Sequence, residues 1–271
     1  MTGRWRITKF LRATAASVTE PAAVALTSAE AYQEWFRSVV GRWTQAPNTW
    51  PATSWTPDTP WGARVLQLMT EVEHDYAASL LEALDAERIR GPIVEFGVFR
   101  GDWLLVLLRA CEARGYARRF IGFDSFQGLP APSADADLDC FEEGQFAAGL
   151  EDVSRRLETH RRDNVVLVPG WFADTLSLPE VAEVREISFV RIDCDLYAPA
   201  LECLRYLGSR LADGAVLVFD DWTFDVTKGE TCAFVEWRPE VPELDFEFLC
   251  FNGVGHLYLR VRRRPVADAQ D

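Results

Sequence analysis

From residue 93 onward, short apolar runs alternate with stretches in which apolar residues recur at helical spacing. An earlier helical pattern covers residues 62–88 and ends at Gly91-Pro92. Strands alternating with helices of this length predict right-handed β-α-β units and a mostly parallel sheet covered on both faces. The last two runs have no helical stretch between them, so we expect an antiparallel hairpin. The pattern predicts strands at residues 93–96, 120–123, 165–168, 187–192, 215–219, 246–251 and 256–261, and helices at residues 103–114, 146–160, 178–184 and 198–211.

The first part of the chain has a different character. Residues 28–44 carry apolar side chains at helical spacing, with Ser28 as the expected N-cap, and residues 45–61 are rich in Pro, Thr and Trp. The tryptophans of this stretch either pack against the main domain or a second subunit, or form a lid over a site. We therefore divide the chain into a helical, Trp-rich extension (residues 1–61) and one α/β domain (residues 62–271).

Composition excludes several classes of protein. The chain has 42 acidic and 28 basic side chains, a formal charge of -14, which opposes binding to nucleic acid or anionic lipid. Its six cysteines contain no C-x-x-C pair, as expected of a reduced protein without zinc or disulfides. No apolar run is long enough to span a membrane, and Glu20-Pro21 interrupts the basic, Ala-rich start before a secretory leader develops. We expect a cytoplasmic protein.

Candidate ligand-binding residues follow the strands, because ligands of open α/β sheets bind outside the carboxyl ends of the strands. Glu95, Gly97 and Gly101 surround the first of these turns. Their G-x-x-x-G spacing is not the dinucleotide G-x-G-x-x-G, so the turn either approaches a ligand closely or simply joins strand to helix. Asp124 follows the second strand, where its carboxylate would accept both hydroxyls of a ribose or cap the next turn.

The third strand ends in Pro169-Gly170-Trp171-Phe172. The two aromatic rings would border the adenine of a nucleoside or fill the core. Either placement buries apolar surface, so the sequence leaves both open.

Four aspartates form the most informative set. Asp193 and Asp195 follow the fourth strand, and Asp220 and Asp221 follow the fifth. Carboxylates gathered at one sheet edge repel one another unless a cation lies between them, and oxygen ligands select magnesium, manganese or calcium. Asp195 could instead cap the next helix and Asp221 could face water, but for Asp193 with Asp220 we favour a metal site.

These segments resemble one known family in the same order along the chain. VEFGVFRGDW, GFDSFQGLP, VPGWFADTL and VRIDCDLYAP with VLVFDDW are similar to the motifs of the macrocin O-methyltransferases, over residues 93–222. The resemblance implies a class I methyltransferase fold, a Rossmann-like three-layer sandwich whose seven-stranded, mostly parallel sheet ends in an antiparallel hairpin. It also implies dependence on S-adenosylmethionine and Mg²⁺ (or Mn²⁺), and methylation of a sugar hydroxyl in a natural product.

The resemblance assigns roles to the residues at the strand ends. Glu95, Gly97 and Gly101 would line the methionine part of the cofactor, and Asp124 with Ser125 would meet the ribose. The segment containing Gly170, Trp171 and Phe172 would complete the cofactor site, and Asp193, Asp220 and Asp221 would hold the metal.

The chain departs from the family where Phe99 replaces a usual Trp and Cys194 a usual Gly, and along residues 223–237, which should face the acceptor. Asp193 is the expected proton acceptor. His256, which opens the last strand, is either structural or an alternative base.

The expected partner is a small-molecule acceptor, in a homodimer or larger homo-oligomer. A phenol or amine acceptor, an NAD(P)-dependent dehydrogenase and a non-catalytic interaction protein are the alternatives.

Overall fold

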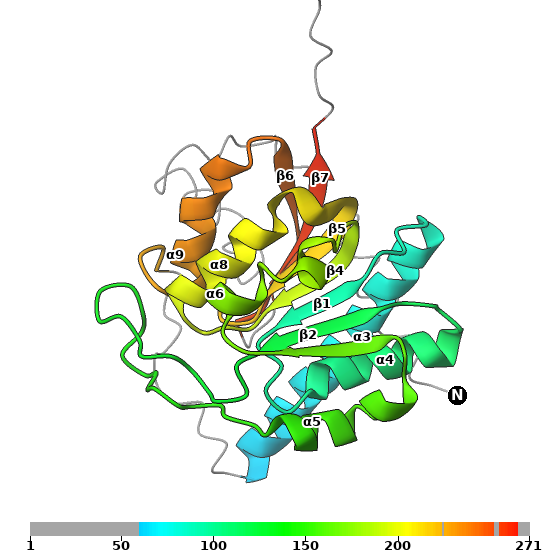
Figure 1. The fold of residues 1–271 in the computed structure, drawn as a ribbon, viewed down its shortest axis with the longest axis horizontal. Coiled ribbons are helices and arrows are strands. Elements are labelled where there is room, and N and C mark those ends of the chain that lie inside the picture. The colour runs from blue at the N-terminus through cyan, green and yellow to red at the C-terminus, as the bar shows by residue number, and fades with distance from the viewer. Residues whose placement is uncertain (1–59, 224, 252–254, 265–271) are drawn as a thin grey trace, which may run out of the picture. The chain divides into compact units, whose positions relative to one another are not determined.

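The computed structural model describes residues 60–223, 225–251 and 255–264. These residues contain one seven-stranded sheet in the order β3-β2-β1-β4-β5-β7-β6 (Figure 1). Strands β1 to β5 run parallel to one another, and β7 is antiparallel to both β5 and β6. The strands are β1 (Ile93–Phe96), β2 (Phe120–Asp124), β3 (Val165–Pro169), β4 (Ile187–Ile192), β5 (Leu211–Phe219), β6 (Leu244–Phe251) and β7 (Leu257–Arg263).

Helices cover the two faces of the sheet (Figure 1). One face carries α3 (Pro60–Ala86), α4 (Asp102–Arg114) and α5 (Leu150–Arg156). The other carries α6 (Phe172–Thr175), α8 (Tyr197–Leu207) and α9 (Gly229–Trp237), and α7 (Pro179–Ala182) precedes β4. Short 3-10 helices lie at Thr159–Arg161, Gly208–Arg210 and Arg238–Glu240. The expected α/β sandwich with an antiparallel C-terminal pair is confirmed.

Two sequence expectations were wrong in detail. The helix expected over residues 146–160 is limited to α5 and a 3-10 turn, whereas the short helix expected near residues 178–184 is confirmed as α7. The sequence analysis missed α9, because Gly229 and buried polar residues such as Glu230 and Thr231 obscure its periodicity. The predicted helix at residues 28–44 and nearly all of the Trp-rich stretch lie outside the described residues. The boundary at residue 61 lies at their limit.

Each face of the sheet has its own core. On the α3 and α4 side, aliphatic residues such as Leu81, Leu104 and Leu107 pack with Phe189. On the α8 and α9 side the packing is largely aromatic, and Phe234 makes edge contacts with neighbouring rings. No helix among the described residues is long and apolar enough to cross a membrane. Cys111, Cys194 and Cys203 are buried free thiols.

The direction of strand order reverses between β1 and β4, which are neighbours at the middle of the sheet. Here the chain segment after β1 passes very close to the segment after β4. Gly97 follows β1 with a φ of 85°, and a Cβ on it would lie 1.7 Å from the carbonyl oxygen of Asp193. Gly97 is therefore required both by its backbone conformation and by the approach of the β4 segment.

We expect Gly97→Ala to lower the free energy of unfolding by more than about 3 kcal/mol, because strain adds to a backbone collision. Gly115 is the matched control, since it also has a positive φ, 69°, but nothing lies within 4 Å of its added Cβ. Gly115→Ala should cost only about 1 kcal/mol. Urea unfolding of both variants measures the difference, and equal losses would contradict the close-crossing explanation.

Candidate functional site

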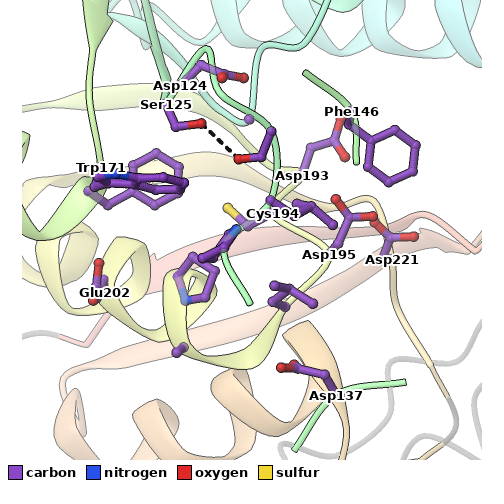
Figure 2. A pocket seen from close by; sticks show the side chains of 18 of the residues that line it. Asp124, Ser125, Asp137, Phe146, Trp171, Asp193, Cys194, Asp195, Glu202 and Asp221 are labelled. Atoms are coloured by element: carbon purple, nitrogen blue, oxygen red, sulfur yellow. Dashed lines mark hydrogen bonds between the residues drawn. The ribbon is translucent and has the colours of Figure 1, made fainter. Parts of the chain in front are cut away.

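A cavity of about 570 Å³ opens at the carboxyl ends of the parallel strands (Figure 2). The turns that follow β1, β2, β3, β4 and β5 and parts of α6 and α8 line it, as expected for a ligand site at the point where strand order reverses. Most of the predicted site residues line it: Gly97, Asp124, Ser125, Gly170, Trp171, Phe172, Asp193, Asp220 and Asp221. Glu95, Gly101 and His256 are not among the described lining residues.

Asp124 ties together the turns that follow β1 and β2. Its Oδ2 accepts the backbone N–H groups of Val98 and Phe99, both at 2.8 Å, and its Oδ1 accepts that of Phe126 at 2.6 Å. Phe99 and Phe126 have positive φ angles, 47° and 54°. The carboxylate thus stabilises two strained turns beside the cavity, and it also caps its own turn.

Trp171 and Phe172 take different positions. The Trp171 ring lines the cavity and stays 38% exposed, whereas Phe172 packs edge-on against Phe96, with ring centroids 5.8 Å apart. One ring thus faces the cavity and the other also packs against the core, and a contact of either ring with adenine stays a prediction. Phe99 and Cys194, the two departures from the family pattern, line the cavity as well.

Three carboxylates meet at one side of the cavity. Oxygens of Asp193, Asp195 and Asp221 lie within 4.8 Å of one another. Asp195 has a φ of 61° and makes no side-chain cap to α8, and it shares a hydrogen bond with Asp221. We call these three residues the acid cluster. It differs from the expected metal set because it contains Asp195 and not Asp220.

Asp220 is directed to a different set of partners. Arg191 lies beside Glu95 in the β1–β4 register, and its guanidinium contacts Glu95 and Asp193 at 2.8 and 2.9 Å as well as Asp220. Burial alone would raise the pKa of Asp220, but Arg191 and His256 hold it well below its usual value. Glu95 is buried under this group, and its Oε2 has no hydrogen-bond partner among the described residues.

His256 is the second cationic partner of Asp220. Its Nε2 is 3.0 Å from Asp220, and its Nδ1 contacts Glu73 of α3, which also accepts a 2.6 Å hydrogen bond from Tyr258. Burial lowers the pKa of His256, but the two carboxylates outweigh this effect and raise it to about 10. The ring is therefore protonated at neutral pH and donates from both nitrogens, which leaves it no lone pair to accept a proton.

In the acid cluster Arg191 contacts Asp193 but, among the described residues, forms no ion pair with Asp195 or Asp221. Burial raises the pKa of Asp195 to about 7, and burial together with the neighbouring carboxylates raises those of Asp193 and Asp221 well above their usual values. Carboxylates that favour protons in this way would exchange them for a bound dication. The donor set is made of hard oxygens, which suits Mg²⁺ or Mn²⁺.

Two buried acids that the sequence analysis missed fix the loops around the cluster. Glu230 of α9 accepts the backbone N–H of Cys194 at 2.8 Å and that of Asp221 at 3.2 Å, so it joins the loops after β4 and β5. Asp137 accepts the first-turn N–H of Tyr197 in α8 at 2.7 Å. No motif marked either residue, because their partners are backbone atoms distant in sequence.

Residues 223–237, which we expected to face the acceptor, are absent from the described cavity lining. Residues 229–237 of this stretch form α9, and most of them are buried. The segment acts on the site through Glu230, since that side chain holds two of the lining loops.

Comparison with known proteins places these features in context. The family model described as "Macrocin-O-methyltransferase (TylF)" matches residues 54–240. A Streptomyces olivaceus protein named 8-demethyl-8-(2,3-dimethoxy-alpha-L-rhamnosyl)-tetracenomycin-C 4'-O-methyltransferase is 32% identical over 157 residues, 55% of this chain and 59% of its own length. Demethyldecarbamoylnovobiocin O-methyltransferase of Streptomyces niveus is 27% identical over 165 residues, 52% of this chain and 56% of its own. The matches thus span little more than half of these relatives.

Solved structures support the fold. The O-methyltransferase NovP has a TM-score of 0.60 at 23% identity, covering 71% of this chain and 80% of its own. The calicheamicin methyltransferase CalS11 has a TM-score of 0.58 at 23% identity, covering 90% of this chain and 98% of its own. The class I methyltransferase architecture expected from the sequence is confirmed.

The buried His256 should make stability depend on pH. Because its folded-state pKa of about 10 exceeds the ordinary value of 6.5, its stabilisation is complete below about pH 6.5 and is lost as the pH rises through about 10. Over this range the unfolding free energy of the wild type should fall by about 4 kcal/mol more than that of His256→Gln. Chemical denaturation at several pH values measures this difference. His160→Gln, which changes an exposed histidine, should follow the wild type; parallel curves for wild type and His256→Gln would contradict the assignment.

Proposed function

Since the chain belongs to the macrocin O-methyltransferase family, we propose that it transfers a methyl group from S-adenosylmethionine to a sugar hydroxyl of a natural product, with a divalent metal bound beside the acceptor. The names of the two curated relatives support this proposal, because both describe O-methyltransferases and one acts on a rhamnosyl group. Family membership also argues against the dehydrogenase and the non-catalytic alternatives. The cytoplasmic location and the homo-oligomer stay predictions.

The cofactor would occupy the side of the cavity formed by Gly97, Asp124 and Trp171. Gly97 presents bare backbone there, Asp124 and Ser125 would meet the ribose, and the exposed Trp171 ring offers a flat apolar surface for adenine. Glu95 and Gly101 would support the cofactor site without lining it. Glu95 would do so through its contact with Arg191, and Gly101 as the N-cap of α4. These residues would fit a nucleoside even though the turn after β1 is not a G-x-G-x-x-G turn.

The acid cluster is the observation that carries the proposal. Asp193, Asp195 and Asp221 would hold the metal, whereas Asp220 is neutralised by Arg191 and His256 and would orient its neighbours. When bound, S-adenosylmethionine would supply the methyl group, and the dication would polarise and position two vicinal hydroxyls of the acceptor. We therefore replace Asp220 with Asp195 in the predicted ligand set.

Asp193 is the residue we propose as general base. Burial and the neighbouring acids raise the pKa of Asp193 well above its usual value, which makes its carboxylate more basic than an exposed one. It lines the cavity at the acid cluster, and Arg191 holds its Oδ2 at 2.9 Å. His256 is the poorer base because it is already protonated and engaged at both ring nitrogens.

Isothermal titration with magnesium tests the ligand set. Asp195→Asn should weaken magnesium binding at least about 10-fold, since it removes one of three charged oxygen donors. Asp163→Asn makes the same charge change at an exposed position outside the cavity and should leave binding at the wild-type level. Equal magnesium affinity in both variants would remove Asp195 from the site.

Steady-state kinetics test the base. With a methyl acceptor and magnesium present, Asp193→Asn should lower turnover at least about 100-fold, because the amide cannot take the hydroxyl proton. The affinity for S-adenosylhomocysteine should stay within about 3-fold of the wild type, since Asp193 is proposed to act on the acceptor. Retention of near wild-type turnover would refute this role.

A further inference from the structure

We propose that Glu230 is a positioning residue of the acid cluster, and that it makes the cluster select Mg²⁺ over the larger Ca²⁺. This inference rests on the proposed function, since it concerns the metal that the cluster would hold. It depends on the burial of Glu230, on the two backbone N–H groups that its carboxylate accepts, and on the contacts of α9 with the loops after β4 and β5.

One carboxylate joins the two loops that carry the acid cluster. Oε1 of Glu230 accepts the N–H of Cys194 at 2.8 Å, and Oε2 accepts the N–H of Asp221 at 3.2 Å. Cys194 lies between Asp193 and Asp195 in the chain. Glu230 therefore holds the loop with two of the clustered acids against the loop with the third, although it is not one of the three residues whose oxygens meet there.

A carboxylate satisfies both N–H groups, and the corresponding amide cannot. The Glu230 side chain is fully buried, so its polar atoms need partners within the protein. A glutamine would present one acceptor oxygen and one NH₂ group, and the NH₂ group would face a backbone N–H. The two hydrogen bonds also offset part of the cost of burying an acidic group. The side chain is therefore suited to hold the two loops at one separation.

The start of α9 is packed against both loops next to Glu230. A Cβ on Gly229 would lie 3.1 Å from the carbonyl oxygen of Asp195, in the loop after β4. On the other side of Glu230, the hydroxyl of Thr231 accepts the N–H of Thr223 at 2.9 Å, in the loop after β5. These contacts leave the Glu230 backbone little freedom to follow a movement of either loop alone.

The rest of α9 is anchored in an aromatic core. Phe234 packs edge-on against Phe219 of β5, with ring centroids 5.3 Å apart, and against Trp222, with centroids 5.6 Å apart. Trp237, at the end of the helix, is almost completely buried. Large rings packed in this way resist displacement, because a shift opens gaps between them. Glu230 thus extends from a rigid support.

A fixed separation between the loops discriminates between cations by size. Mg²⁺ takes oxygen ligands at about 2.0–2.1 Å in near-octahedral geometry, whereas Ca²⁺ takes them at about 2.3–2.6 Å in flexible geometry. The oxygens of the acid cluster already lie within 4.8 Å of one another. Loops that Glu230 holds together therefore favour the smaller ion, and loops freed from it could separate to admit the larger one.

Calorimetric titration of the full chain with MgCl₂ and with CaCl₂ tests the inference. The measured quantity is the dissociation constant of Ca²⁺ divided by that of Mg²⁺, and it should exceed unity in the wild type. Glu230→Gln should lower this ratio at least about 5-fold, because the lost charge weakens both ions alike but the loosened loops favour Ca²⁺. A wild-type ratio below unity, or an unchanged ratio in Glu230→Gln, would overturn the proposal.

Asp137→Asn is the matched control. Asp137 is also a buried carboxylate that accepts two backbone N–H groups, those of Ser133 and Tyr197, both at 2.7 Å. Neither group belongs to the acid cluster or to Cys194. The control makes the same change from acid to amide and should keep the ratio within about 2-fold of the wild type. An equal fall of the ratio in both variants would contradict a specific role of Glu230.

Glu230→Asp is the second variant, in case Glu230→Gln does not fold. It keeps both acceptor oxygens but is shorter by one methylene group, about 1.5 Å, so it should lose one of the two bonds. The ratio should fall in this variant as well, and circular dichroism shows whether each variant is folded. Failure of both variants to fold would also overturn the proposal, since Glu230 would then serve the fold and not the choice of ion.

The same titrations separate this inference from the proposed function. A wild type that binds magnesium with a selectivity that Glu230 does not affect overturns the positioning role alone. Failure of the wild type to bind magnesium refutes the metal-dependent reaction, and the positioning role with it.

Discussion

The buried Arg191 guanidinium is the interaction on which the site depends. It lies at the point where strand order reverses and contacts Glu95 from β1, Asp193 after β4 and Asp220 after β5. Without this cation three carboxylates would lose their compensating charge in a buried environment, which is strongly unfavourable. Arg191 thus joins the ends of β1, β4 and β5, and it compensates Asp220 and Asp193 but, among the described residues, forms no ion pair with Asp195 or Asp221 of the acid cluster.

Backbone hydrogen bonds to buried acids provide the second constraint. Asp124 holds the turns after β1 and β2, Asp137 holds the start of α8, and Glu230 holds the loops after β4 and β5. Each carboxylate accepts N–H groups that regular secondary structure leaves unpaired, and these bonds offset the cost of burying the acid. The strained conformations at Phe99 and Asp195 persist because the surrounding contacts fix them.

The distribution of charge connects this framework to the proposed chemistry. Positive charge is concentrated beneath the cavity, in Arg191 and the protonated His256, whereas the cavity surface is acidic and partly aromatic. A dication would suit the oxygen donors of such a surface. His256 takes part through Asp220 and Glu73, so α3 is connected to the catalytic edge by a buried chain of polar contacts.

Much of this protein was determined by its sequence alone. The alternation of apolar runs and helical stretches was sufficient for the sheet and its antiparallel end, because each strand and helix must bury its own apolar face. Ligands of open α/β sheets bind beyond the carboxyl ends of the strands, and this rule was sufficient to predict that Gly97, Asp124 and Asp193 lie at one site. The grouping of the acids was decided only by the tertiary structure. Adjacent residues such as Asp220 and Asp221 point to different partners, and no local pattern encodes which distant cation or backbone N–H each carboxylate meets.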